Sequence, residues 1–373
     1  MRIAHVLTFL DSKRSYGGPV TVALGLAEEQ IRQGEQVSLV TLSNEANMTF
    51  LPEGLSRKIF QVRKRNSNKK FSGLFSIRAL YWLFTNRNKF DIFHLHYSRD
   101  VFQVLAGLIL TRGQATVILQ PHGMITNTLS TKKRYQSIYD WAFTNRVVSR
   151  AAGVVALQEI EAKALSDNFT CGEIAIVPNG IKFGEITDEK SRSKGLVVFV
   201  SRLHPQKDPH IFLDAALNLI QNGTELDFEI GGPDGGLKFE IVSRINAAKS
   251  DQLKFLGSLD NKQVLQLFRK ANILVLPSID DPYPMVVLEA LSCGLEVVLS
   301  SSSGLASAIQ ENKLGRVFEP GLQNLEEAIL LAISGERDPI SVRQTAEKLF
   351  NISAVVTTLE SVYQRFQMPK QEK

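Results

Sequence analysis

Cysteine is scarce in this sequence, because among 373 residues there are only Cys171 and Cys293. The two lie far apart and lack the spacing of metal ligands, which argues against a disulfide framework and favours a reducing compartment. Long apolar runs are missing too: none approaches the ~20 residues of a membrane-spanning helix, and the apolar start at 1–11 is too short for a signal peptide. We therefore expect a globular cytoplasmic protein.

Acidic side chains are missing from one long segment, because residues 57–90 contain ten Lys or Arg and no Asp or Glu. Residues 1–185 hold 23 Lys and Arg against 14 Asp and Glu, net +9, whereas residues 186–373 hold 20 against 24, net −4. Apolar residues recur at helical spacing within the basic segment, at Leu74, Ile77, Leu80, Tyr81 and Phe84.

Two interpretations of this basic segment remain open. The helix could dock on an anionic membrane surface, which would make the protein peripheral on the inner face of the membrane. It could instead face the core, with the charges on either side of it solvated. A nucleic-acid partner is not expected.

Strand-like and helix-like segments alternate along the chain. A strand at 3–9, a helix at 19–32 and a strand at 36–42 make a βαβ unit, and such alternation predicts a parallel sheet covered by helices. The pattern restarts at 195–201 after a polar stretch, and roughly 100 to 200 residues per domain makes two domains natural. We expect α/β domains at 1–186 and 187–350, with a C-terminal helix at about 351–367 packing back on the first.

Ligands of open parallel sheets bind beyond the carboxyl ends of the strands, so the loops that follow strands are the candidate sites. In the first half these loops carry Gly17, Gly18, His94, His96 and His122. In the second half they are 202–207, 231–232, 278–289 and 300–304. Two such rows of loops predict a cleft between the domains.

Six motifs follow one another along the chain: YGGPV, PHG, VPNGI, SRLHPQKD, FLGSLD and LPSIDDPYPMVVLEALSCGLEVVLSSSSG. In this order they resemble the retaining family 4 glycosyltransferases of the two-lobe GT-B fold. The resemblance implies two Rossmann-like lobes, a nucleoside diphosphate sugar held mainly by the second lobe, and a glycan or lipid-linked acceptor met by the first.

The resemblance also implies roles for single residues. Arg202 and Lys207 match the cations that bind the diphosphate, where fixed positive charge stabilises the leaving group. Glu289 matches the acid that accepts hydrogen bonds from the nucleotide ribose, and Asp281 the acid that contacts the donor sugar. In the first lobe, His122 matches the histidine that contacts the sugar near the reacting centre.

Glycines and a helix start complete the expected donor site. Gly17 and Gly18 precede a helix that begins with Pro19, and would let a phosphate approach the backbone. Gly304 and Leu305 lie between a strand and a helix, where free N–H groups suit a diphosphate. Neither segment has the GxGxxG pattern of a dinucleotide fold, which disfavours a nicotinamide enzyme.

Four positions depart from the family pattern. Ser201 and Asp208 stand where the family has glycines before the Arg and after the Lys, so the backbone angles of that loop do not follow from the resemblance. Asp281 replaces a Glu and is one methylene shorter. Ser307 stands where many members have another Glu, so the sugar pocket is expected to be roomier or less acidic than is common.

The resemblance, together with these residues, implies a retaining, metal-independent hexosyltransferase of surface polysaccharide or glycolipid biosynthesis, without a cofactor. One alternative is a nucleotide-sugar-binding protein of weak activity, suggested by Asp281 and Ser307. A second is a metal-dependent hydrolase that uses His94, His96 and His122. No third ligand accompanies the pair at 94 and 96 at a sensible spacing, so packing at the strand end is the better interpretation of these two. Their place at the carboxyl end of a strand leaves a role in acceptor binding open.

Overall fold

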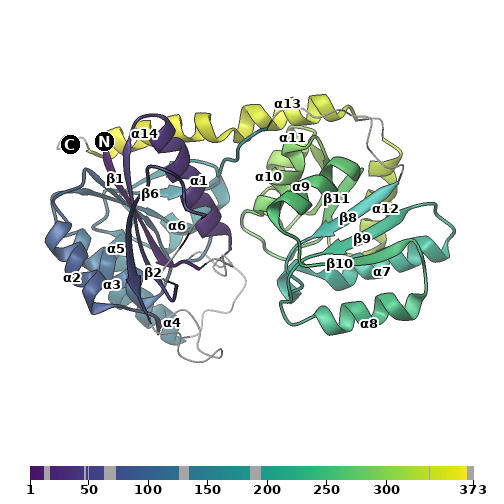
Figure 1. Ribbon diagram of the computed structural model, residues 1–373, viewed down its shortest axis with the longest axis horizontal. Helices are drawn as coiled ribbons and strands as arrows, with labels where there is room; N and C mark the ends of the chain where they lie inside the picture. Colours follow the sequence, from purple (N-terminus) through teal and green to yellow (C-terminus); the bar gives the residue numbers. More distant parts are fainter. Residues whose placement is uncertain are drawn as a thin grey trace. The chain divides into compact units, whose positions relative to one another are not determined.

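A computed structural model of the chain describes residues 1–11, 17–45, 48, 50–62, 73–125, 134–184, 195–335 and 337–367. The chain divides into two compact units, which are coloured along the sequence in Figure 1. Unit 1 contains Met1–Gly180 and Ile352–Lys373, and unit 2 contains Ile181–Asn351. None of the helices in the described ranges is both long and apolar enough to cross a bilayer.

Unit 1 is built on a seven-stranded sheet of order β3-β2-β1-β4-β5-β6-β7 in which neighbouring strands are parallel. The strands are β1 Arg2–Phe9, β2 Gln36–Ser43, β3 Ser56–Gln61, β4 Ile92–His96, β5 Thr116–Gln120, β6 Gly153–Ala156 and β7 Glu173–Ile176. Residues 3–9 of β1 are all buried. A continuous apolar run of this kind is typical of a strand covered on both faces, as predicted.

The helices of unit 1 include one that comes from the far end of the sequence. They are α1 Gly18–Arg32, α2 Ile77–Asn86, α3 Val101–Leu110, α4 Arg134–Tyr139, the π-helix η2 Asp140–Thr144, α5 Asn145–Val148, α6 Glu159–Asn168 and α14 Ile352–Gln367. In Figure 1, α14 is the yellow helix beside α1, and it contacts α1 and β5. Gly153 admits this helix, because a Cβ there would lie 2.2 Å from the ring of Phe366.

Unit 2 has a six-stranded parallel sheet of order β10-β9-β8-β11-β12-β13. Its strands are β8 Leu196–Val200, β9 Asp227–Gly231, β10 Leu253–Gly257, β11 Ile273–Leu276, β12 Glu296–Ser300 and β13 Gly315–Phe318. Its helices are the 3-10 turn η4 Pro205–Lys207, α7 Pro209–Gln221, α8 Lys238–Ala248, α9 Asn261–Lys270, α10 Met285–Ser292, α11 Ala306–Glu311, α12 Leu322–Ile333 and α13 Pro339–Phe350. The predicted α/β architecture with two parallel sheets is confirmed.

Helix α2 faces the core through Ala79 and Leu83, with Leu80 and Trp82 partly buried against the same cluster, whereas three other large apolar residues are exposed. Ala79 and Leu83 are buried, whereas Ile77, Tyr81 and Phe84 are 75%, 68% and 52% exposed. The core-facing interpretation is therefore wrong for these three large side chains. Residues 63–72 of the basic segment lie outside the described residues.

Candidate functional site

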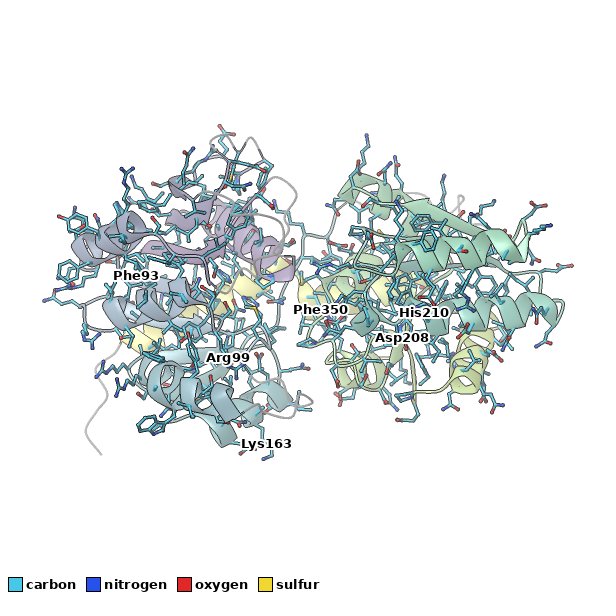
Figure 2. The ribbon with its side chains drawn as sticks, turned by 90° about the horizontal axis from the view of Figure 1, so that it is seen from below. Phe93, Arg99, Lys163, Asp208, His210 and Phe350 are labelled. Atoms are coloured by element: carbon cyan, nitrogen blue, oxygen red, sulfur yellow. The ribbon has the colours of Figure 1, made fainter. Side chains whose placement is uncertain are left out.

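The loop after β8 carries Arg202 and Lys207 and passes through a left-handed residue before α7 begins. That residue is Asp208, with φ 45° and ψ 57°, and its carboxylate accepts a hydrogen bond from Ile211 N at 3.3 Å. Asp tolerates the left-handed region better than most residues because its short side chain bonds to nearby backbone. Asp208 thus makes a left-handed turn at a position where the sequence resemblance leads us to expect glycine, and Figure 2 labels it beside His210 at the start of α7.

Glycines of the loop after β9 allow it to lie against the backbone of this first loop. A Cβ on Gly232, whose φ is 151°, would lie 1.8 Å from Ser201 O, and one on Gly235 would lie 2.8 Å from Arg202 Cγ. The glycine that this close approach requires is therefore Gly232, directly after the neighbouring strand β9, and not a glycine at position 201. The sequence pattern pointed to 231–232 but not to Gly235.

Lys207 and Asp281, which are 74 positions apart, form an ion pair between Nζ and Oδ2. Their side chains are 22% and 8% exposed, so the pair is largely shielded from water. Arg202 is exposed, and within the described ranges its side chain has no hydrogen-bond or ion-pair partner. The structure thus brings two of the predicted site residues, Lys207 and Asp281, into contact, and Arg202 is a second cation on the loop of Lys207.

Hydrogen bonds to backbone carbonyls tie the loop of Asp281 to its neighbours. Ile279 N donates to Gln206 O at 2.8 Å, and Gln206 Nε2 donates to the carbonyl of Asp280 at 3.1 Å. Gly304 N donates to the carbonyl of Asp281 at 2.9 Å. The loops after β8, β11 and β12 therefore form one cluster at the carboxyl end of the sheet, where ligands of such folds bind.

The amides expected to receive a diphosphate already have partners within the chain. Gly304 N bonds to Asp281 O, as above, and Leu305 N donates to Ser303 Oγ at 3.4 Å. An anion at these amides must therefore replace existing hydrogen bonds. Glu289 lies half-buried on α10 and Ser307 is exposed on α11.

The start of α1 in unit 1 is shaped for close approach by a ligand. Gly17 has φ 66° and ψ −133°, which favours glycine, and none of the described side chains caps the helix. A Cβ on Gly18 would meet no described atom within 4 Å, and Pro19 follows in the first turn. The preceding residues 12–16 lie outside the described part of the chain.

His122 follows β5 in a strained turn that a buried carboxylate holds. Its φ is 53° and that of Gly123 is 74°. Glu161 accepts hydrogen bonds from Gly123 N at 2.6 Å and from Leu157 N at 2.7 Å, and so joins the loops after β5 and β6. Burial raises the pKa of Glu161 against the effect of these two amides. No sequence motif pointed to Glu161.

A second anchor of the same loop comes from the segment after β4. The guanidinium of Arg99, labelled in Figure 2, donates to Met124 O at 2.9 Å and to Ile125 O at 2.6 Å. It also forms an ion pair with Asp140 at 2.8 Å. The backbone after His122 is therefore held on both sides by charged groups.

His94 and His96 use both ring nitrogens in hydrogen bonds to protein. His94 contacts Gln120 at 3.0 Å and Tyr363 at 2.5 Å, and His96 contacts His5 at 3.0 Å and His122 at 2.8 Å. Burial lowers the pKa of both rings well below the ordinary range. Among the described residues, no three His, Cys, Asp or Glu side chains are grouped to hold a metal ion. The hydrolase alternative thus lacks its ligand geometry, and the sequence analysis overlooked His5.

Two family models match successive parts of the chain. Residues 16–184 match Glycosyltransferase Family 4, and residues 185–349 match Glycosyl transferases group 1.

Curated relatives are distant. One of them, a subunit of the human phosphatidylinositol N-acetylglucosaminyltransferase, is 25% identical over 94% of this chain and 73% of its own length. A D-inositol 3-phosphate glycosyltransferase of Actinosynnema mirum is 27% identical over 46% of this chain, which spans about half the length of that relative. An uncharacterised 41.2 kDa protein in the cps region of Klebsiella pneumoniae is 24% identical over 78% of this chain and 82% of its own.

Solved structures share the fold of the whole chain. Anabaena HepE in complex with UDP-glucose superposes with a TM-score of 0.73 and 17% identity, over 98% of this chain and 100% of that one. The lipopolysaccharide outer core galactosyltransferase WaaB superposes with a TM-score of 0.68 and 16% identity, over 98% and 100%. These matches confirm the predicted GT-B type of fold.

Proposed function

Because the chain belongs to the glycosyltransferases of family 4 and group 1, we propose that it transfers a hexose-type sugar from a nucleoside diphosphate to an acceptor hydroxyl with retention of configuration. The observation that carries the proposal is the loop cluster of unit 2. There Lys207 forms an ion pair with Asp281 and shares its loop with the exposed Arg202, at the carboxyl end of a parallel sheet.

The chemistry of transfer explains why cations belong in this cluster. Breaking the bond between sugar and diphosphate builds negative charge on the leaving group, and fixed cations stabilise that charge more than they stabilise the bound donor. The exposed guanidinium of Arg202 can bind two phosphate oxygens, whereas the ammonium of Lys207 acts as a point charge. These two cations supply the positive field in this proposal, without a metal ion.

Asp281 has two tasks in the proposed reaction. In the free protein it neutralises Lys207 and holds the ammonium in place. With donor bound, the second partner of Lys207 is a phosphate oxygen, and the Asp281 carboxylate accepts a hydrogen bond from the sugar. Retention then follows a same-face route, in which the departing phosphate accepts the proton of the acceptor hydroxyl. Glu289 accepts hydrogen bonds from the ribose of the nucleotide.

Uridine diphosphate sugars are the first donors to test. HepE, which shares this fold, was solved with UDP and with UDP-glucose. The relatives named above include a phosphatidylinositol N-acetylglucosaminyltransferase and a protein of a cps region. We infer from these names a glycan or lipid-linked acceptor, as in surface polysaccharide or glycolipid synthesis.

An exposed apolar stripe on unit 1 supports a lipid-linked acceptor. The stripe consists of Phe75, Ile77, Tyr81 and Phe84, which are 51%, 75%, 68% and 52% exposed. Arg78 lies within the same turns, and the guanidinium of Arg87 lies 4.1 Å from the centroid of the Phe84 ring. Apolar side chains beside cations are typical of helices that lie in the headgroup layer of an anionic membrane.

Vesicle sedimentation tests this docking. The parent protein should bind anionic vesicles more than neutral ones and should lose binding as salt is raised. Tyr81→Ser should bind more weakly, whereas Phe239→Ser, which changes an 89% exposed ring of unit 2, should bind like the parent. Equal binding to neutral and anionic vesicles, or none to either, would refute membrane docking and favour a soluble acceptor.

Calorimetry with a panel of nucleoside diphosphate sugars tests donor binding. A donor at ~100 times its Kd stabilises the folded state by about 2.7 kcal/mol, which raises the melting temperature measurably. Arg202→Ala and Lys207→Ala should remove most of this shift. Lys270→Ala, which removes an exposed cation at the end of α9, should retain it. A panel without any shift would contradict the proposed donor class.

A further inference from the structure

Seven buried side chains of unit 1 form one continuous hydrogen-bonded chain that ends at His122. In order they are Gln120, His94, Tyr363, Gln30, His5, His96 and His122. The contacts between successive members are 3.0, 2.5, 3.5, 2.8, 3.0 and 2.8 Å. His122 is 9% exposed, and the others are at most 2% exposed or fully buried. We call these residues the histidine chain.

Strand register and the C-terminal helix bring the members together. The pairing of β1 with β4 sets His5 opposite His94, and the pairing of β4 with β5 sets His96 opposite Gln120. The rings of His96 and His122 stack with centroids 5.1 Å apart. Gln30 comes from α1, and Tyr363 comes from α14. The histidine chain is therefore complete only when α14 is docked on unit 1.

The glutamines give the histidine chain a direction. A carbonyl oxygen only accepts hydrogen bonds and a neutral imidazole has a single N–H. Gln120 Oε1 therefore accepts from His94 Nε2, which leaves His94 Nδ1 to accept from the Tyr363 hydroxyl. The Tyr363 oxygen accepts in turn from Gln30 Nε2.

The same rule assigns the remaining rings. Gln30 Oε1 accepts from His5 Nε2, so His5 Nδ1 accepts from His96 Nε2. His96 Nδ1 then accepts from His122 Nε2, and the lone pair of His122 is left on Nδ1. Exchanging the donor and acceptor atoms of any one member would set two donors or two acceptors face to face in a buried site, which is costly. All members therefore donate their hydrogen bonds in the same direction along the histidine chain.

Burial keeps the rings neutral, as this assignment requires. It lowers the pKa of His5 to about 4 and that of His122 to about 3. An imidazolium has two N–H donors and no acceptor, so a charged ring would set a donor against the N–H of its neighbour.

We propose that the histidine chain fixes His122 as the neutral Nε2–H tautomer, so that its Nδ1 accepts a hydrogen bond from a hydroxyl of the donor sugar. This inference rests on the proposed function. His5, Gln30 and Tyr363 act through the histidine chain as positioning residues. Because a site built to pair with a sugar hydroxyl discriminates against an analogue that lacks it, the tautomer contributes to the choice of donor.

Nitrogen-15 NMR measures the tautomer without any substrate. The protein has six histidines, so labelling histidine with nitrogen-15 gives a simple imidazole spectrum. The His122 signals are identified by their loss in His122→Gln. At pH 7 we expect a protonated Nε2 and an unprotonated Nδ1 at His122. A protonated Nδ1, with or without a protonated Nε2, would overturn the proposal.

A pair of glutamine variants tests the role of the histidine chain. Gln30→Met interrupts it at its centre, whereas Gln103→Met replaces another fully buried glutamine that bonds to Val6 O and lies outside it. Gln30→Met should show a mixture of tautomers at His122 and about tenfold lower kcat/KM for donor, the value of one hydrogen bond of ordinary strength. Its affinity for free nucleoside diphosphate should equal that of the parent.

The tautomer of His122 is measured in both the control variant and the interrupted variant. Gln103→Met should retain the single tautomer of the parent. A single, unchanged tautomer in folded Gln30→Met would overturn the positioning role. If Gln30→Met does not fold, the spectrum of the parent still supports or overturns the assignment, and it does so even if the proposed transfer reaction fails.

Discussion

Removing Lys207 from its ion pair with Asp281 is expected to destabilise unit 2 more than removing the charge of Asp281. Asp281 is only 8% exposed, so Lys207→Met leaves a buried carboxylate without its cation. Breaking a buried pair by removing one partner costs about 3–5 kcal/mol, and the 22% exposure of Lys207 places this pair near the lower value. Asp281→Asn should cost less, because the flexible ammonium can reach water.

These energies correspond to measurable temperature shifts. A loss of about 3 kcal/mol lowers the Tm of a domain of this size by about 6–12 °C. The variant that combines Lys207→Met with Asp281→Asn should recover part of the loss, with a coupling energy of about 1–3 kcal/mol.

The Tm of unit 2 has to be measured by calorimetry, because both tryptophans, Trp82 and Trp141, lie in unit 1. Tryptophan fluorescence then serves as a control that should be unchanged by the variants. Asp214→Asn breaks a more exposed pair with Arg244 in the same unit, with side chains 41% and 35% exposed, and should cost less than about 1 kcal/mol. An unchanged calorimetric Tm in Lys207→Met, or zero coupling in the double variant, would refute the reasoning.

Two further predictions concern backbone space and pH. Gly232→Ala should destabilise unit 2 much more than Gly223→Ala in calorimetry. Both glycines have positive φ, but only a Cβ at 232 would overlap a backbone oxygen, at 1.8 Å. Equal losses of stability in the two variants would contradict the close approach. The low pKa values of His5, about 4, and His122, about 3, make the unfolded state bind more protons below pH 6.5. The stability of unit 1 should therefore be complete above pH 6.5 and fall as the pH is lowered toward 4, by up to about 1.4 kcal/mol per pH unit for each histidine. The Tm from tryptophan fluorescence should follow this fall, with a shallower slope in His5→Gln, and an identical slope in that variant would speak against the assignment.

The sequence predicted the sheets well because buried parallel strands have continuous apolar runs. Residues 3–9 and 196–200 are largely apolar, and both form central strands. The position of Arg202 and Lys207 after a strand was also predictable from order along the chain. Their neighbours were not, because the contact of Lys207 with Asp281 depends on how β8 and β11 pair.

The helical spacing of apolar residues did not predict which side of α2 is buried. The spacing of Ile77, Tyr81 and Phe84 predicts a helix but does not say whether its apolar face is covered, and these residues are exposed. His5 gave no signal because a single histidine in an apolar strand is unremarkable. Its importance arises from the register of β1 with β4 and from a helix more than 300 positions away.

The most direct test of the account is to follow transfer from a nucleoside diphosphate sugar by proton NMR, with the parent and Arg202→Ala. We expect one nucleoside diphosphate released per new glycosidic bond, with the anomeric configuration of the donor retained in the product. Arg202→Ala should lower kcat/KM by about 10²-fold or more, since one charge-stabilising group of this kind is worth about 2.7–4 kcal/mol. A product of inverted configuration, or an Arg202→Ala variant as active as the parent, would contradict the central claim.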